Sequence, residues 1–86
     1  MPDTFTFELV TPDKLLLSTQ AVYVNAPGVE GDFGVLPGHM PFVSLLREDS
    51  VLSINDETDK THVFTISGGL AQVTATSVTI LAEGIQ

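Results

Sequence analysis

The sequence predicts an all-β fold, an antiparallel sandwich or barrel, on three observations. Segments of roughly four to seven residues, rich in β-branched and aromatic side chains, lie between short turn signals. The turn signals recur about every eight to twelve residues, a spacing typical of small β-sandwiches. No window combines an apolar repeat of helical period with capping residues. We therefore expect the 86-residue chain to form one sandwich domain over residues 1–86.

The individual strands follow from alternation and from the turns between them. Residues 5–9 alternate apolar and polar side chains, which is the pattern of a half-buried strand. Polar or glycine-containing turns then separate each later apolar segment from the next. The expected strands are 5–9, 15–19, 21–25, 31–36, 42–47, 51–54, 61–67, 70–73 and 77–81.

The stretch from residue 27 to residue 41, PGVEGDFGVLPGHMP, differs in composition from the rest of the chain. Seven of its fifteen residues are glycine or proline, which widen and narrow the permitted backbone angles, respectively. The stretch therefore predicts a shaped loop that contains one short strand. We expect a positive φ at one or more of Gly31, Gly34 and Gly38.

The ionisable side chains of this stretch are Glu30, Asp32 and His39. The two carboxylates lie on a predicted turn, so we expect both to be exposed. A shaped loop with so few reactive groups is more typical of a contact surface than of a catalytic site. The stretch therefore favours a surface that docks a partner.

The charge balance excludes several classes of partner. Eleven acidic residues and three basic ones, Lys14, Arg47 and Lys60, give a formal net charge of −8. A nucleic-acid-binding protein needs a basic patch, and an anionic lipid surface would repel this chain. No apolar run reaches the roughly 18 residues that indicate a membrane span, so we expect no membrane insertion. The acidity instead favours a basic protein partner. The amino-terminal segment MPDTFTFELV carries an acid and no cationic region, which is not the pattern of a secretory signal, so we expect a cytoplasmic setting.

A catalytic triad is the first chemical alternative, and it would combine Ser67, His39 and Asp32. Such a triad needs the serine on a strained turn beside a base and an oxyanion hole. Ser67 precedes Gly68 and Gly69, but the sequence is not the pattern of a nucleophile elbow. The paired glycines fit a bulge or a close approach of strands. A small hydrolase using Ser67 and His39 stays as an alternative hypothesis.

Metal and phosphate sites receive less support from the sequence. His39 and His62 are 23 residues apart and lack ligand-type spacing, so Glu30 and Asp32 do not complete a recognisable set. The acidic segment 55–60 lacks the central glycine and distal glutamate of a calcium loop and predicts a solvated turn. The glycines of the central stretch do not form a phosphate-binding motif. We expect no metal and no cofactor.

Residues 24–42, VNAPGVEGDFGVLPGHMPF, resemble the signature of the epsilon subunit of the bacterial rotary ATP synthase, which is called delta in mitochondria. Residues 9–12, the Ser-Gly-Gly segment at 67–69 and residues 78–82 also resemble segments of this family, so the similarity covers the chain in order. The signature is matched at Pro27, Gly28, Gly31, Phe33, Gly34, Val35, Leu36, Pro37, Gly38, His39 and Pro41.

This resemblance implies a ten-stranded antiparallel sandwich of two five-stranded sheets. It also implies a non-catalytic rotor subunit of the central stalk in a proton-transporting ATP synthase, which couples ion flow to ATP synthesis. Its partners would be the gamma subunit and the c-ring, at the cytoplasmic face of the bacterial inner membrane. The isolated chain would be a monomer that binds no ATP.

The resemblance also assigns residues to the two partners. The acidic turn matches the segment that meets the c-ring loops, and a carboxylate-bearing turn suits basic or amide-bearing loops. The implied c-ring contacts are Val29, Glu30, Gly31 and Asp32. The implied gamma contacts are Thr11, Pro37, Gly38, His39, Pro41, Phe42 and Ser44.

The sequence departs from the family at its carboxyl end. Many members carry a pair of helices after the sandwich that inhibits ATP hydrolysis and in some cases binds ATP. Here the sequence ends with the expected sandwich, at residue 86, so the resemblance implies neither property for this chain. A free-standing adaptor sandwich with another partner is the remaining alternative.

Overall fold

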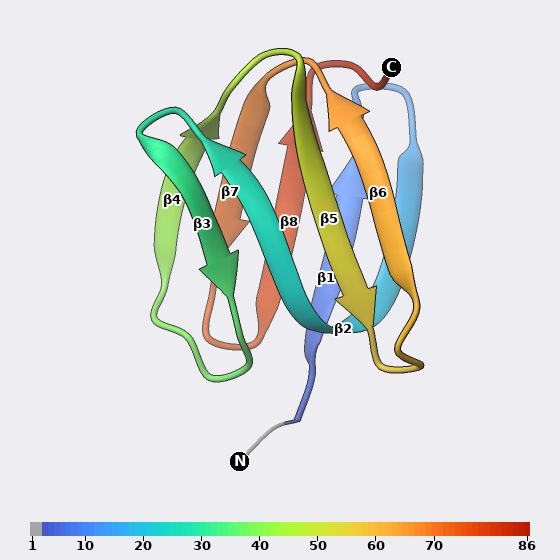
Figure 1. Cartoon of the computed structure of the whole chain (residues 1–86), viewed down its shortest axis with the longest axis vertical. Helices are drawn as coiled ribbons and strands as arrows, with labels where there is room; N and C mark the ends of the chain where they lie inside the picture. The colour runs from blue at the N-terminus through green and yellow to red at the C-terminus, as the bar shows by residue number, and fades with distance from the viewer. Residues whose placement is uncertain (1–2) are drawn as a thin grey trace.

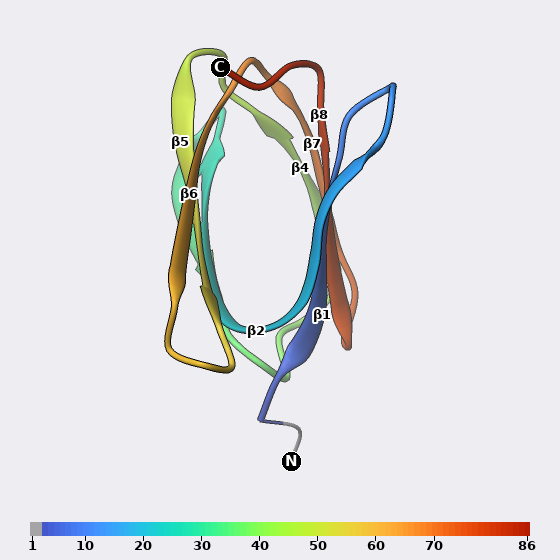
Figure 2. The same ribbon diagram turned by 90° about the vertical axis from the view of Figure 1, so that its right-hand side faces the viewer.

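The computed structural model describes residues 3–86, so Met1 and Pro2 of the expected domain lie outside the described residues. Residues 3–86 form eight strands and no helix, and the described part of the chain therefore offers no helical membrane span. The strands stack in two layers that face one another, which confirms the predicted all-β sandwich (Figures 1 and 2). The strands are β1 (Phe5–Val10), β2 (Leu15–Gly28), β3 (Gly31–Val35), β4 (Phe42–Leu46), β5 (Ser50–Asp56), β6 (Thr61–Ile66), β7 (Gly69–Val73) and β8 (Ser77–Ala82).

The longest strand, β2, belongs to both layers. Its first half pairs with β1, and its second half pairs with β3 and β5. The register with β5 shifts between Ala21 and Tyr23, and an irregularity of this kind bends a strand. Figure 2 shows β2 curving from one layer into the other. A five-strand layer thus contains the first half of β2 with β1, β8, β7 and β4, and a four-strand layer contains β3, the second half of β2, β5 and β6.

The architecture differs from the expectation in three details. The strands expected at 15–19 and 21–25 are the two halves of β2, because the bend at Ala21 does not interrupt the chain's extended conformation. The structure has eight strands where the resemblance implies ten, and the shared β2 makes the layers five and four strands wide. β1 and β8 pair in parallel, whereas the other strand pairs are antiparallel.

The core lies between the layers and is built from alternate residues of each strand. On β1, Phe5, Phe7 and Leu9 face inward because successive side chains of a strand point to opposite faces. Each large apolar side chain buried in this way contributes about 1.5–3 kcal/mol. The buried core consists of Phe5, Phe7, Leu9, Ala21, Val24, Ala26, Val35, Leu46, Leu52, Ile54, Ile66, Ala71, Val73, Val78, Ile80 and Ala82.

The connections between strands gather at the two ends of the sandwich. At the upper end in Figure 1 lie the β2–β3 turn, the β1–β2 hairpin, the β6–β7 connection and the carboxyl terminus. We call this the acidic-turn end. At the lower end lie the β3–β4 loop, the β5–β6 hairpin and the β7–β8 turn. We call this the His39 end.

The carboxyl-terminal residues cross the acidic-turn end and join the two layers. The chain leaves β8 in the five-strand layer and reaches β6 in the four-strand layer, where Ile85 forms a bridge with Ile66 (Figure 2). The amide of Ser67 donates to the carbonyl of Gly84 at 2.9 Å, and the amide of Gln86 donates to the carbonyl of Thr65 at 2.9 Å. This strap closes one end of the core.

Candidate docking surfaces

The acidic turn connects β2 to β3 through Val29 and Glu30, with Gly28 and Gly31 paired across it. Gly31 has a φ of +137°, which confirms the expected positive φ and which an L-residue rarely adopts. The amide of Val29 donates to the carbonyl of Leu45 at 2.9 Å, so the turn is anchored to β4. Glu30 is exposed, and its carboxylate makes no hydrogen bond to residues 3–86.

Arg47 binds the same turn from the residue after β4. Its Nη2 lies 2.5 Å from Asp32 Oδ1, and its Nη1 donates to the carbonyl of Gly28 at 2.6 Å. Asp32 is exposed, as expected, but its carboxylate is paired with Arg47, and no pattern in the sequence indicates that pair. The partner is 15 residues away along the chain, so no local pattern reveals it.

Two glycines of the signature, Gly28 and Gly34, lie where an aromatic ring covers the backbone. A Cβ at Gly34 would lie 2.8 Å from a ring carbon of Tyr23, and a Cβ at Gly28 would lie 3.1 Å from the ring of Phe33. Real Cβ atoms rarely approach other atoms so closely, so these positions need glycine for space. The signature therefore serves close packing as well as turn formation.

The β3–β4 loop forms the His39 end of the same stretch. Gly38 has a φ of +84°, and Leu36 and Met40 are 61% and 80% exposed. The ring of His39 packs edge-on against Phe5 with their centroids 5.4 Å apart. Both ring nitrogens of His39 are buried and have no hydrogen-bond partner in the described part of the chain. The loop is therefore seated by packing and exposes apolar side chains.

The remaining residues of the expected gamma-facing set do not all lie together. Phe42 is partly exposed and packs edge-on against Phe33 at 5.2 Å, beside the loop. Ser44 is half-buried, and its hydroxyl donates to the carbonyl of Leu45. Thr11 lies in the β1–β2 hairpin, at the opposite end of the sandwich from His39 (Figure 1). The structure thus splits the set and places the acidic turn and His39 at opposite ends of β3.

The proposed catalytic triad is not assembled. The amide of Ser67 donates to the carbonyl of Gly84 in the carboxyl-terminal strap, and its hydroxyl accepts a hydrogen bond from Nε2 of Gln86 at 3.3 Å. The β3–β4 loop, which contains His39, lies at the other end of the molecule (Figure 1), and Asp32 is paired with Arg47. No group of three potential metal ligands occurs within residues 3–86. The hydrolase hypothesis therefore loses its geometric basis.

The acidic segment 55–60 forms the β5–β6 hairpin around a buried carboxylate. Asp56 accepts hydrogen bonds from the hydroxyl and amide of Thr58 and from the amide of Lys60, and Nε2 of His62 lies 2.9 Å from Oδ2. The hydrogen bond from the Thr58 hydroxyl, followed by that from His62, holds the pKa of Asp56 far below its ordinary value. Residues 57–60 are exposed, as expected of a solvated turn, whereas Asp56 is buried and hydrogen-bonded, which we did not expect.

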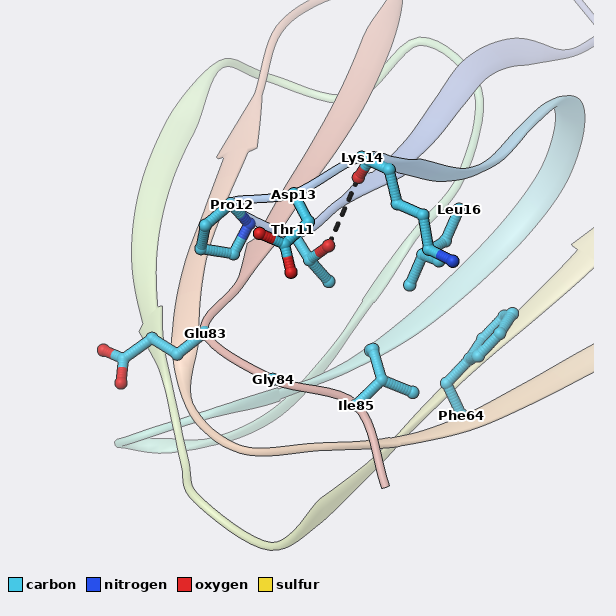
Figure 3. Close-up of a pocket in the computed structure, with 9 residues that line it drawn as sticks. All are labelled: Thr11, Pro12, Asp13, Lys14, Leu16, Phe64, Glu83, Gly84 and Ile85. Carbon is cyan, nitrogen blue, oxygen red and sulfur yellow. Dashed lines mark hydrogen bonds between the residues drawn. The ribbon is translucent and has the colours of Figure 1, made fainter.

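A pocket beside the β1–β2 hairpin was not indicated by the sequence. Its volume is about 470 Å³, and it lies between the hairpin, β6 and the carboxyl-terminal strap (Figure 3). Leu16, Phe64 and Ile85 supply apolar walls, and Lys14 reaches over them from the hairpin. Because its walls come from three distant segments, no local pattern predicts it.

An exposed apolar row was also missed, although the alternation of the strands contains it. Paired residues point to the same face of a sheet, and the register links Leu45 to Leu70, Leu70 to Leu81, Leu81 to Val10 and Val10 to Leu15. Leu45, Leu81 and Leu15 are 61%, 42% and 52% exposed. The outer face of the five-strand layer therefore carries apolar side chains close to the acidic-turn end.

Fold and surface together define a small β-sandwich module with shaped loops at both ends, and the triad of Ser67, His39 and Asp32 is not brought together within residues 3–86. The family model described as ATP synthase, Delta/Epsilon chain, beta-sandwich domain matches residues 4–86. The chain belongs to this family, and the resemblance seen in the sequence is confirmed.

Individual relatives agree with the family model. An ATP synthase epsilon chain from Nitratidesulfovibrio vulgaris is 49% identical over 86 residues, which are 100% of this chain and 63% of the relative. The chain thus spans less than two thirds of that relative's length. An ATP synthase epsilon chain from Caulobacter vibrioides is 49% identical over 77 residues, which are 90% of this chain and 87% of the relative.

Among solved structures, the fold is similar to a chain in the structure of the Euglena gracilis mitochondrial ATP synthase, OSCP/F1/c-ring. The TM-score is 0.89 at 27% sequence identity, and the match covers 100% of this chain and 54% of that chain. The similarity therefore extends over the whole sandwich.

Proposed function

We propose that this chain is a non-catalytic rotor subunit of the proton-transporting ATP synthase and that it connects gamma to the c-ring within the central stalk. The observation that carries the proposal is the family-model match over residues 4–86. The relatives described as ATP synthase epsilon chains, at 49% identity, give it further support. In this role the domain couples ion flow to ATP synthesis through its contacts and breaks no bond itself.

The acidic turn is the proposed contact with the c-ring. Val29 is 52% exposed, and Glu30 next to it carries a carboxylate that no described residue neutralises. Gly31 sets the shape of the turn through its positive φ, and Asp32 closes it through Arg47. An ordered turn that presents one apolar side chain and one free charge suits polar or basic loops of a partner.

The His39 end is the proposed contact with gamma. Its loop exposes apolar side chains on a backbone that is fixed by a positive φ at Gly38 and by the packing of His39. Thr11 lies at the other end, so its proposed contact with gamma would be a separate one. The proposed gamma contacts within the loop and β4 are Pro37, Gly38, His39, Pro41, Phe42 and Ser44.

The rest of the proposal concerns the setting of the chain. Residues 1–86 form one domain that is a monomer when isolated and binds no ATP, no nucleic acid and no metal. It associates peripherally with the cytoplasmic face of the bacterial inner membrane as part of the synthase. A free-standing adaptor explains the sandwich equally well but leaves the family match unexplained.

A charge reversal at the acidic turn tests the proposal. Glu30→Lys in a reconstituted synthase should lower proton-driven ATP synthesis, because it reverses the free charge of the c-ring contact. Its melting curve should change little, since substitutions of exposed, unbonded side chains usually alter stability by about 0.5 kcal/mol or less. Glu57→Lys makes the same charge change on the exposed β5–β6 hairpin and is the matched control.

Two outcomes would count against the c-ring contact. Normal synthesis by the Glu30→Lys enzyme would remove the acidic turn from the interface. An equal loss in the Glu30→Lys and Glu57→Lys enzymes would indicate an effect of net charge in place of a local contact.

A further inference from the structure

Arg47 makes hydrogen bonds to four parts of the sandwich, β2, β3, β5 and the β6–β7 connection, and no pattern in the sequence indicates these contacts. Its backbone amide donates to the carbonyl of Pro27 at 2.9 Å. Its carbonyl accepts hydrogen bonds from the hydroxyl of Ser50 at 2.7 Å and from the amide of Gly68 at 3.2 Å. The backbone of Arg47 is thus fixed against β2, β5 and the β6–β7 connection, so its side chain starts from a defined position.

The guanidinium spans the acidic turn. One nitrogen binds the carbonyl of Gly28, before the turn, and another binds the carboxylate of Asp32, after it. Because the guanidinium is planar and its donors have fixed spacing, the two anchors are held at a fixed separation. The guanidinium therefore fixes the distance between Gly28 and Asp32, and Val29 and Glu30 lie between them.

The same contacts determine which charge the turn presents. Asp32 is compensated by Arg47, whereas Glu30 has no cation or donor among the described residues. The two side chains of the ion pair are 42% and 53% exposed, and pairs this exposed contribute little to stability. The main consequence of the pair is therefore the geometry of the turn.

We propose that Arg47 is the positioning residue of the acidic turn and holds Val29 and Glu30 in the shape that contacts the c-ring. This inference rests on the proposed function. Arg47 touches the partner only through the turn that it orders. Lysine at this position keeps the charge, but its three donors lie on one freely rotating nitrogen, so it lacks the planar fork that holds the two anchors at a fixed separation.

The first measurement uses the isolated 86-residue chain. Backbone ¹⁵N relaxation should show residues 28–32 losing order in Arg47→Gln, losing part of it in Arg47→Lys, and staying unchanged in Lys60→Gln. Lys60→Gln is the matched control because it removes the same charge from an exposed side chain on the β5–β6 hairpin. If Arg47→Gln unfolds, Asp32→Asn removes one anchor without touching the backbone of Arg47.

The second measurement compares these variants in the reconstituted synthase. Arg47→Gln should weaken binding of the subunit to the c-ring by about two- to tenfold, the cost of ordering one side chain on binding. Arg47→Lys should fall between Arg47→Gln and the parent chain, and Lys60→Gln should match the parent. If net charge governed attraction to a basic partner, both glutamine variants would bind more tightly than the parent. The direction of the change in affinity therefore distinguishes a positioning role of Arg47 from an effect of net charge.

The failures of the two proposals are distinguishable. Unchanged order at residues 28–32 in Arg47→Gln and Asp32→Asn would overturn the positioning role, whatever the synthase does. A loosened turn with normal binding to the c-ring would overturn the contact assigned to the turn. Equal effects of Arg47→Gln and Lys60→Gln would assign the result to net charge and also overturn the positioning role.

Discussion

The two ends of β3 carry the two halves of the glycine- and proline-rich stretch, and different forces hold them. At the acidic-turn end, Arg47 binds Gly28 and Asp32 through polar contacts. At the His39 end, the imidazole packs edge-on against Phe5, and neither ring nitrogen is hydrogen-bonded within residues 3–86. One sequence signature thus builds two surfaces of different kinds.

The difference shows what each surface can present to a partner. Polar anchoring leaves Glu30 as a free charge on an ordered turn. Apolar seating leaves Leu36 and Met40 exposed on a loop whose polar ring is withdrawn from water. We infer that charge dominates recognition at one end and burial of apolar surface dominates at the other.

The largest expected effect comes from the strand that separates the two ends. Gly34→Val should lower the free energy of unfolding by about 1–3 kcal/mol, because its side chain would collide with the ring of Tyr23. Gly38→Ala, which has open space but a φ of +84°, should lower it by about 1–2 kcal/mol. Urea denaturation of both variants measures the difference. A Gly34→Val chain as stable as the parent would show that Tyr23 moves freely and does not fix β3.

The next test asks whether polar contacts also fix a hairpin at the His39 end, where apolar packing seats the β3–β4 loop. The Asp56 hairpin lies at the His39 end but is held by polar contacts. Because the pKa of Asp56 is lower in the folded chain, its stabilisation is complete above the ordinary value of 3.8 and is lost as the pH falls below it. The stability advantage of the parent over Asp56→Asn should therefore be constant near neutral pH and shrink below about pH 4.

Thermal melting of both chains from neutral to acid pH measures this advantage. His62→Gln serves as the control, because it removes one partner of Asp56 and keeps the carboxylate. An advantage that does not depend on pH would mean that the ionised carboxylate contributes nothing to the hairpin.

The smallest expected effect concerns His39 itself. His39→Leu should change the free energy of unfolding by less than about 1 kcal/mol, because an apolar side chain can replace a buried ring that makes no hydrogen bond. His62→Leu should be more destabilising, since it leaves Asp56 without one of its partners. Calorimetry of the two variants makes the comparison. A large loss in His39→Leu would show that the imidazole is held by polar contacts.

The sequence predicted the local features of the fold because they depend on neighbouring residues. Alternation and turn signals located β1 and the later strands. Glycine content predicted a positive φ at one or more of Gly31, Gly34 and Gly38, and the structure has it at Gly31 and Gly38. Pairings between distant segments were not predictable in the same way. The parallel contact of β1 with β8 and the sharing of β2 by both layers depend on how the core packs.

The same limit applies to the candidate surfaces. The signature located the acidic turn and the loop around His39, but it did not show that the five residues of β3 lie between them. It also did not show that the β1–β2 hairpin, which contains Thr11, lies at the acidic-turn end. Arg47 was visible only as one of three cations, since its partners lie 15 and 19 residues away along the chain. Contacts at such separations are set by tertiary structure.

Single-cysteine cross-linking in the assembled synthase tests most directly whether the two ends of β3 face different partners. The chain contains no cysteine, so each introduced thiol is unique within it. We expect Glu30→Cys to cross-link to the c-ring, Met40→Cys to cross-link to gamma, and Val63→Cys, on the outer face of the four-strand layer, to cross-link to neither. Cross-linking of Glu30→Cys and Met40→Cys to the same subunit, or of Val63→Cys to the c-ring, would contradict the account.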